Sequence, residues 1–184
     1  MKLFSIALLA LIAVSPLAAG TLADFSEGMG RVFTVTSDRF FAARPEVAVA
    51  EDASAPNGKA LVAKIGAIKE GVKFARYDVV VKLTAEEAAK IREISFDVKV
   101  SDAKAFGWIM LYFFKANRGN DFLKQSIGKT KNFKFGEWQH FVFPMSEFKP
   151  EGKGVGMAEV RQFVITFFVY GPVEISVANV ACAE

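Results

Sequence analysis

The sequence is poor in the residues that form covalent crosslinks and most catalytic centres. It contains one cysteine, Cys182, and one histidine, His140, in 184 residues. A single cysteine excludes a disulfide within the chain, so packing must stabilise the fold. One imidazole and one thiol are also too few for a usual zinc site, and a triad has only this imidazole to use. We expect His140 to be a strand residue bonded to a neighbour, and Cys182 a small residue ending the last strand.

Paired carboxylates for glycoside hydrolysis are not evident either. Glu93 and Asp97 share one side of a predicted strand, but residues four apart on a strand are separated by about 13 Å. Glycoside chemistry requires roughly 5 to 9.5 Å between its two carboxyl groups. The sequence therefore favours a protein that is not an enzyme.

Charge of one sign is not concentrated in the chain as a whole. The formal net charge is +3, with both signs mixed along the sequence. This balance is too mild to indicate a nucleic-acid partner.

Only one long apolar run is present, and it lies at the N-terminus. Lys2 precedes an apolar stretch over residues 3–14, which is followed by Pro16 and the small residues Ala18, Ala19 and Gly20. The run is shorter than the roughly 20 residues of a membrane-spanning helix. Its order of parts is that of a secretory signal peptide. We expect a signal peptide over residues 1–20, with cleavage between positions 19 and 23, a secreted or periplasmic protein, and no membrane span after cleavage.

The remaining residues, 21–184, fit one domain dominated by strands. In residues 94–100 the side chains of Ile94, Phe96, Val98 and Val100 fall on one face, and polar side chains on the other. This period of two indicates antiparallel sheet. The other segments assigned as strands are residues 31–36, 59–67, 72–83, 108–116, 137–145, 160–170 and 173–181. Such a series, with 19 phenylalanines to bury, predicts an all-β sandwich or barrel.

Two segments depart from this pattern. Thr84 and Glu87 have the spacing of a capping box, which predicts one short helix ending near Ile91. Residues 48–55 are polar and alanine-rich, and we expect them to form a surface loop.

Three stretches resemble a known family of β domains. They are residues 83–98, with a short turn before the Ile94 strand; residues 136–148, with Trp138 before a strand and Pro144 after it; and the paired closing segments 160–165 and 171–180. Together they resemble the galactose-binding-like jelly rolls, which include carbohydrate-binding modules and the complex I intermediate-associated protein family. The resemblance implies a two-sheet antiparallel jelly-roll β-sandwich, a structural role for Trp138, and reversible, non-catalytic binding of polysaccharide.

The same resemblance suggests one structural calcium ion. The family's last strand often carries an aspartate that helps to hold calcium, and this chain has Asn179 there. Since calcium takes six to eight oxygen ligands and accepts amide oxygens, Asp24, Glu27 and Asn179 are the candidate ligands. The alternative is that these residues form a plain N-terminal cap and strand end.

The candidate ligand face comes from two strands that are apolar on both sides. In residues 108–114, an aliphatic-rich side suited to the core alternates with a second side that carries Trp108 and Tyr112. Residues 163–170 repeat this pattern, with Tyr170 on the second side. Either the second face is an aromatic cleft for sugars or loops cover it as a minor core. In the first case Trp108, Tyr112 and Tyr170 would stack on sugar rings, while Arg118, Asn120 and Gln125 would bond to hydroxyls.

Basic residues gather in the following loop region. They are Arg118, Lys124, Lys129, Lys131 and Lys134. They favour either an acidic polysaccharide as ligand or a lysine-rich sheet edge that resists aggregation.

A second functional class also stays open, in which the protein is a structural or adaptor protein of the cell envelope that binds a protein partner through the apolar sheet face.

Overall fold

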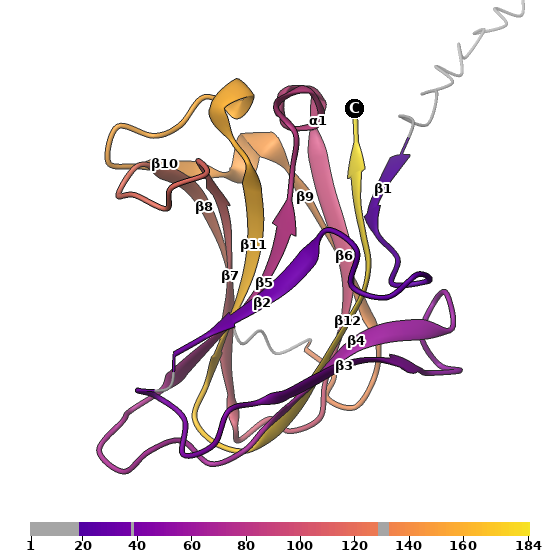
Figure 1. Ribbon diagram of the computed structural model, residues 1–184, viewed down its shortest axis with the longest axis vertical. Helices are drawn as coiled ribbons and strands as arrows, with labels where there is room; N and C mark the ends of the chain where they lie inside the picture. The colour runs from indigo at the N-terminus through magenta and orange to yellow at the C-terminus, as the bar shows by residue number, and fades with distance from the viewer. Residues whose placement is uncertain (1–18, 38, 129–132) are drawn as a thin grey trace, which may run out of the picture.

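The computed structural model describes residues 19–37, 39–128 and 133–184. Its strands form two antiparallel six-stranded sheets that pack face to face (Figure 1). The all-β jelly-roll prediction is therefore confirmed. The strands are β1 (Ala19–Ala23), β2 (Val32–Thr36), β3 (Glu46–Glu51), β4 (Lys59–Ile65), β5 (Ala75–Lys82), β6 (Glu93–Val100), β7 (Phe106–Phe114), β8 (Phe122–Ile127), β9 (Gln139–Pro144), β10 (Lys149–Glu151), β11 (Gln162–Val169) and β12 (Val173–Ala183).

Sheet I has the order β3-β4-β12-β6-β9, and β1 also pairs with β12. The first part of β12 pairs with β4 and its last part with β1, so these two strands follow one another along the same neighbour. Asn179, with a φ of 46°, lies where the register of β12 shifts. The shift is a bulge that lets one long strand serve both partners.

Sheet II has the order β10-β8-β7-β11-β5-β2. Its three central strands are fully paired: Phe167 of β11 lies between Ile109 of β7 and Tyr77 of β5. The two segments that are apolar on both sides, β7 and β11, therefore lie side by side in one sheet.

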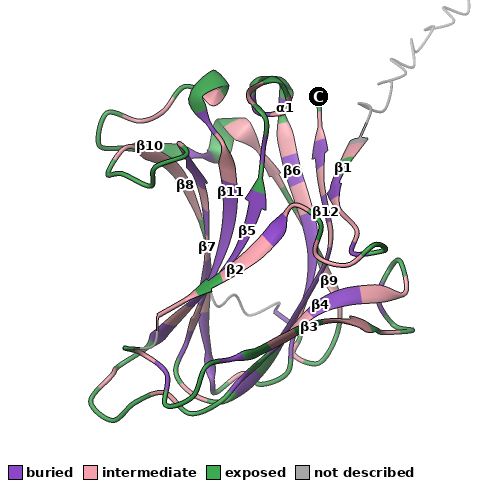
Figure 2. Ribbon diagram, viewed as in Figure 1, coloured by how far each residue is buried: buried purple, intermediate pink, exposed green. Residues whose placement is uncertain are grey.

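The core lies between the sheets and follows the period of two. Ile109, Leu111 and Phe113 of β7 are fully buried, as are Phe96 and Val98 of β6 (Figure 2). Each sheet contributes one face, which is the arrangement that stacked sheets require. Cys182 is a buried free thiol near the end of β12, as expected.

The one α-helix among the described residues, α1 (Ala85–Lys90), connects β5 of sheet II to β6 of sheet I. Its N-terminus is held by the predicted capping box: the Glu87 amide donates to Thr84 Oγ1 at 3.2 Å, and the Thr84 amide donates to Glu87 Oε2 at 2.8 Å. These bonds satisfy two backbone donors that a helix start leaves free. Two short 3-10 turns, η1 (Met145–Glu147) and η2 (Met157–Glu159), complete the regular structure of the described chain.

Part of residues 48–55 was assigned wrongly as loop. Glu46–Glu51 forms the edge strand β3, paired with β4 from Glu46 opposite Lys64 to Glu51 opposite Lys59. Val47 and Val49 pack on the core while the alternate residues face outward. The small side chains of Ala48 and Ala50 hid this alternation. The strands β1, β8 and β10 were also not predicted.

The loop that follows β3 folds back over the outer face of sheet I. Ala55 packs against Ala60, Ala178 and Trp138, and Trp138 Nε1 donates to Ser54 Oγ at 3.2 Å. The structural role expected for Trp138 is confirmed. Sheet I is thus partly covered from outside by its own chain.

The predicted signal peptide falls almost entirely outside the described residues. Of its positions, Ala19 and Gly20 lie in β1, opposite Ala183 and Cys182. Among the described helices, none has the length and hydropathy of a transmembrane segment.

The two faces of β11 make a stability prediction. Phe167 is fully buried between the sheets, whereas its neighbour Phe168 lies half-buried on the outer face of sheet II. We expect Phe167→Ala to lower the free energy of unfolding by about 3–5 kcal/mol, and Phe168→Ala by clearly less, because its ring remains partly in contact with water. Urea unfolding measures both changes. Equal losses would contradict the assignment of the faces.

Candidate functional site

The outer face of sheet II is built from side chains that lie in register on its three central strands. Asp78 of β5 is opposite Thr166 of β11, which is opposite Met110 of β7. One row along, Val80 and Val164 are followed by Tyr112. A row with the polar residues Asp78 and Thr166 therefore runs beside an apolar row that ends in Tyr112.

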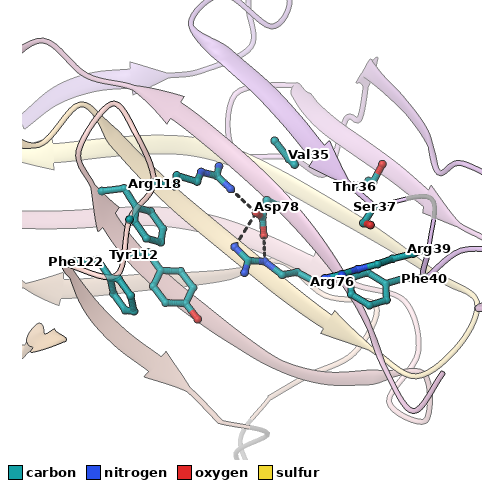
Figure 3. Close-up of a pocket in the computed structure, with 12 residues that line it drawn as sticks. Val35, Thr36, Ser37, Arg39, Phe40, Arg76, Asp78, Tyr112, Arg118 and Phe122 are labelled. Atoms are coloured by element: carbon teal, nitrogen blue, oxygen red, sulfur yellow. Dashed lines mark hydrogen bonds and ion pairs between the residues drawn. The ribbon is translucent and has the colours of Figure 1, made fainter. Parts of the chain in front are cut away.

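A hollow of about 390 Å³ lies over these rows (Figure 3). Strands β2, β5, β7 and β8 all contribute residues to this hollow, so it runs as a groove across the outer face of sheet II. Its lining residues are Val35, Thr36, Ser37, Arg39 and Phe40 from β2 and the following segment, Arg76 and Asp78 from β5, Tyr112 and Phe114 from β7, and Arg118, Gly119 and Phe122 from the loop after β7 and the start of β8.

Asp78 is the centre of the hydrogen-bond network in this groove. Arg76 donates through Nε and Nη2 to the two carboxylate oxygens, at 2.8 and 2.9 Å. Arg118 Nη1 donates to Oδ2 at 2.9 Å, and the Thr166 hydroxyl donates to Oδ1 at 2.8 Å. The Asp78 side chain is only 3% exposed. A buried carboxylate needs such partners, and here each oxygen accepts two bonds.

Aromatic rings form the wall beside this network. Tyr112 stacks on Phe114 at 5.3 Å and meets Phe122 edge-on at 5.4 Å. The guanidinium groups continue the wall, with Arg76 5.7 Å from the Tyr112 ring centre and Arg118 5.6 Å from that of Phe114. Burial raises the pKa of Tyr112 above its usual value, so its hydroxyl can donate and accept at neutral pH.

A second group of rings, which we call the aromatic patch, lies on the same face, with Phe168 and Trp108 in register with Arg76. Trp108 and Phe168 stack at 4.3 Å with an interplanar angle of 10°, and Phe74 meets both edge-on at 5.6 Å. Tyr170 completes the patch at 6.3 Å from Trp108. Phe74 and Tyr170 are 40% and 47% exposed, so the patch is open to solvent.

The structure places four of the six residues selected as glycan contacts in two separate groups, two residues in each. Tyr112 and Arg118 line the groove, and Trp108 and Tyr170 belong to the aromatic patch. Gln125 lies apart, opposite the core residue Leu111, and donates to Glu147 Oε2 at 3.0 Å.

Asn120 does not line the groove, and it is exposed. It lies beside Gly152, where its carbonyl oxygen would be 2.6 Å from an added Cβ.

Both alternatives for the outer face are partly realised. Val80, Val164 and Phe114 are buried there as a small second core, while the groove stays open above them. Long side chains of neighbouring strands cover this second core, since Tyr112 and Phe122 pack against its three buried residues.

Sequence reasoning missed Arg39, Arg76 and Asp78. A charged pair at positions 76 and 78, on one face of an otherwise apolar strand, was the signal that could have shown two of them. Of the described residues in the basic loop region, Arg118 alone lines the groove. Lys124 pairs with Glu151, and Lys134 lies 3.6 Å from Glu137. Lys129 and Lys131 lie outside the described residues.

Comparison of this geometry with known structures identifies the architecture. No protein-family model matches the sequence, and a search of curated proteins found no match. A family 11 carbohydrate-binding module from Clostridium thermocellum, in complex with a β-1,3-1,4-mixed-linked tetrasaccharide, has a TM-score of 0.65 over 92% of this chain and 98% of its own, at 16% identity. The fold is that of carbohydrate-binding modules.

Two further structures support this conclusion. A family 30 module of a cellulosomal cellulase from Clostridium thermocellum gives a TM-score of 0.60, covering 91% of this chain and 99% of its own at 11% identity. A family 61 module in complex with β-1,4-galactotriose gives 0.54, covering 88% and 94% at 10% identity. At such identities the similarity defines the fold alone.

The predicted calcium ligands lie away from the groove. Asn179 is in β12 of sheet I, and Asp24 and Glu27 are in the segment that follows β1. Asp24 and Asn179 line a hollow of about 570 Å³ with Asp97 and His140. Asp97 accepts from Asn179 Nδ2 at 3.0 Å and is bonded to His140 Nδ1 at 2.9 Å, so the expected role of His140 as a bonded strand residue is confirmed. Glu27 lines a different hollow with Asp24.

This donor set does not fit calcium. Asp24 Oδ1 already accepts from the Ser26 amide and hydroxyl, and both Asp97 oxygens are occupied. Over the residues that the structure describes, no three His, Cys, Asp or Glu side chains gather as a metal site. Calcium requires six to eight oxygens, and the three predicted ligands do not share one hollow.

The Asp78 network makes a prediction by double-mutant cycle. Asp78→Asn leaves two half-buried guanidinium groups without their common carboxylate, and we expect a loss of about 3 kcal/mol in unfolding free energy. Adding Arg118→Gln removes one of these charges, so the double variant should lose less than the sum by about 1–2 kcal/mol. Urea unfolding of the four proteins measures the coupling. Additive losses would show that the two residues do not interact.

The arrangement of the candidate calcium ligands leads to a second prediction. Because the candidate ligands do not gather, we expect the melting temperature to be the same in calcium and in EDTA. A ligand that binds only the folded state would raise it. Differential scanning calorimetry of the full chain makes the comparison, with magnesium as a control ion. A calcium-specific rise would show that other donors complete a site.

Proposed function

We propose that this protein is an exported, non-catalytic polysaccharide-binding protein whose ligand lies in the groove on the outer face of sheet II. The observation that carries this proposal is the groove itself, a hollow bordered by Tyr112, Phe114 and Phe122 and crossed by polar side chains. A pyranose ring presents apolar C–H faces to aromatic rings and hydroxyls to polar groups, so it needs both kinds of surface together.

The similar solved structures support the class of ligand. Two of them are complexes, one with a tetrasaccharide and one with a galactotriose. The N-terminal sequence, with Lys2, an apolar run and small residues before position 21, supports export.

The chemistry of the groove supports binding without hydrolysis. Asp78 is the one carboxylate among the described residues that line the groove. Each of its two oxygens already accepts two hydrogen bonds. Glycoside hydrolysis requires two carboxyl groups that flank the scissile bond. A single buried and fully bonded carboxylate supplies neither an accessible acid nor a nucleophile.

The aromatic patch favours a second candidate, an envelope adaptor that binds a protein partner. Phe74 and Tyr170 expose apolar surface beside the groove, and interfaces are enriched in aromatic residues. Glycan binding explains the groove and the patch together, whereas the adaptor function explains the patch alone.

A Tyr112→Ala variant tests the proposal. The change removes a ring from the groove wall, and we expect affinity for a bound glycan to fall about tenfold, the value of one stacking contact. Isothermal titration calorimetry against a panel of neutral and acidic polysaccharides measures the affinity. Val142→Ala, an exposed residue of β9 on sheet I, is the matched control and should bind as the unmodified protein does. If no glycan binds and a protein partner is isolated that requires Tyr170, the adaptor function replaces this proposal.

A further inference from the structure

Among the described residues that line the groove, positive charge exceeds negative charge. Three guanidinium groups, those of Arg39, Arg76 and Arg118, stand there against one described carboxylate, that of Asp78. Arg76 and Arg118 both bind the Asp78 carboxylate, so these two arginines and the aspartate together carry a net charge of one positive unit. Arg39 adds another. Its neighbour in sequence, Asp38, lies outside the described residues.

Other acidic residues of the described chain do not offset this excess. Glu151 pairs with Lys124 and Glu159 with Lys115, and neither glutamate lines the groove. No described carboxylate forms an ion pair with Arg39, whose guanidinium lies 4.6 Å from the centre of the Phe40 ring. A concave, partly desolvated surface focuses such a field and attracts anions.

The groove also offers a ligand more hydrogen-bond donors than acceptors. Arginine only donates, and each guanidinium has five N–H groups. Asp78 uses Nε and Nη2 of Arg76, and Nη1 of Arg118, while Arg118 Nε donates to Gln162 at 3.0 Å. Among the described residues, no partner binds Nη1 of Arg76, Nη2 of Arg118 or the guanidinium of Arg39 through a hydrogen bond.

Acceptors for a ligand are scarce by comparison. The Asp78 carboxylate is buried and bonded, and the remaining side-chain oxygens of the lining are the hydroxyls of Thr36, Ser37 and Tyr112. A neutral sugar presents hydroxyls that donate as well as accept. A ligand that mainly accepts, such as one bearing carboxylates, matches this groove better.

We infer that the groove binds an acidic glycan, one whose sugar units carry carboxylate groups, with Arg39, Arg76 and Arg118 as the cationic side of the site. The inference rests on the proposed function and adds the class of ligand. The planar fork of arginine matches a carboxylate with two parallel bonds. The rings of Tyr112 and Phe114 then contact the sugar face.

The experiment compares polygalacturonate with its methyl ester, which has the same backbone without the charge. We expect the acid form to bind, the ester to bind at least about tenfold more weakly, and affinity for the acid form to fall as salt is raised. Mixed-linked β-glucan and dextran sulfate are titrated in parallel, all by isothermal titration calorimetry on the full chain.

Two variants separate a site from a general charge effect. Arg39→Gln and Lys64→Gln each remove one exposed positive charge, the first at the groove and the second on β4 of sheet I. Arg39→Gln should weaken binding of polygalacturonate about tenfold, and Lys64→Gln should leave it unchanged. Equal weakening by both would overturn the inference, because net charge alone would explain it.

The remaining outcomes are also distinct. Equal affinity for the acid and the ester, or binding of the β-glucan alone, would overturn the acidic ligand and leave the glycan-binding function in place. Tighter binding of dextran sulfate than of polygalacturonate would overturn the carboxylate assignment. Failure of every glycan to bind would remove the proposed function itself.

Discussion

The burial of apolar side chains on both faces of three adjacent strands is the constraint on which the rest of the structure depends. Stacking of the two sheets buries only the inner face of β5, β11 and β7. On the outer face, Val80 and Val164 are also fully buried, although no second layer of strands lies there. Long side chains of the same sheet must therefore cover them, and the space between those side chains is the groove.

The two outer faces meet this requirement differently. On sheet I, alanines and valines are covered by the segment after β3 together with Trp138, and Lys99 Nζ joins this cover through Asp52 at 2.5 Å. On sheet II, cover comes from arginines and aromatic rings that reach across from neighbouring strands. Arginine packs its stem on apolar surface and keeps its charged end accessible. The outer face of sheet I is therefore partly covered by a folded-back segment and Trp138, whereas that of sheet II is covered by arginines and aromatic rings.

Much of the fold could be predicted from the sequence because local patterns determine it. Alternation placed Ile109 and Trp108 on opposite faces of one strand, and the spacing of Thr84 and Glu87 gave the helix start. The edge strand β3 was missed because its alanines carry little contrast between faces. Gln125 lies opposite the core residue Leu111 and away from the groove. Because β8 was not recognised as a strand, the direction of its side chains could not be assigned from the sequence.

The candidate site was harder to predict because its parts meet only through register. Asp78 lies 40 residues from Arg118 and 88 from Thr166 in sequence, and no local pattern states which strands become neighbours. Aromatic residues were found because a strand that is apolar on both sides is unusual in itself. The arginines needed the pairing of β5 with β11 and β7 before their common carboxylate could be seen.

The pairing of β1 with β12 has a consequence for how the chain is connected. Ala19 lies opposite Ala183, so the first and last strands of the described domain end side by side (Figure 1). Such proximity is what circular permutation requires. A short linker from Ala183 to Ala19 would close the domain into a ring, and new ends could then be opened in an exposed turn, such as that at Gly71, without separating either sheet.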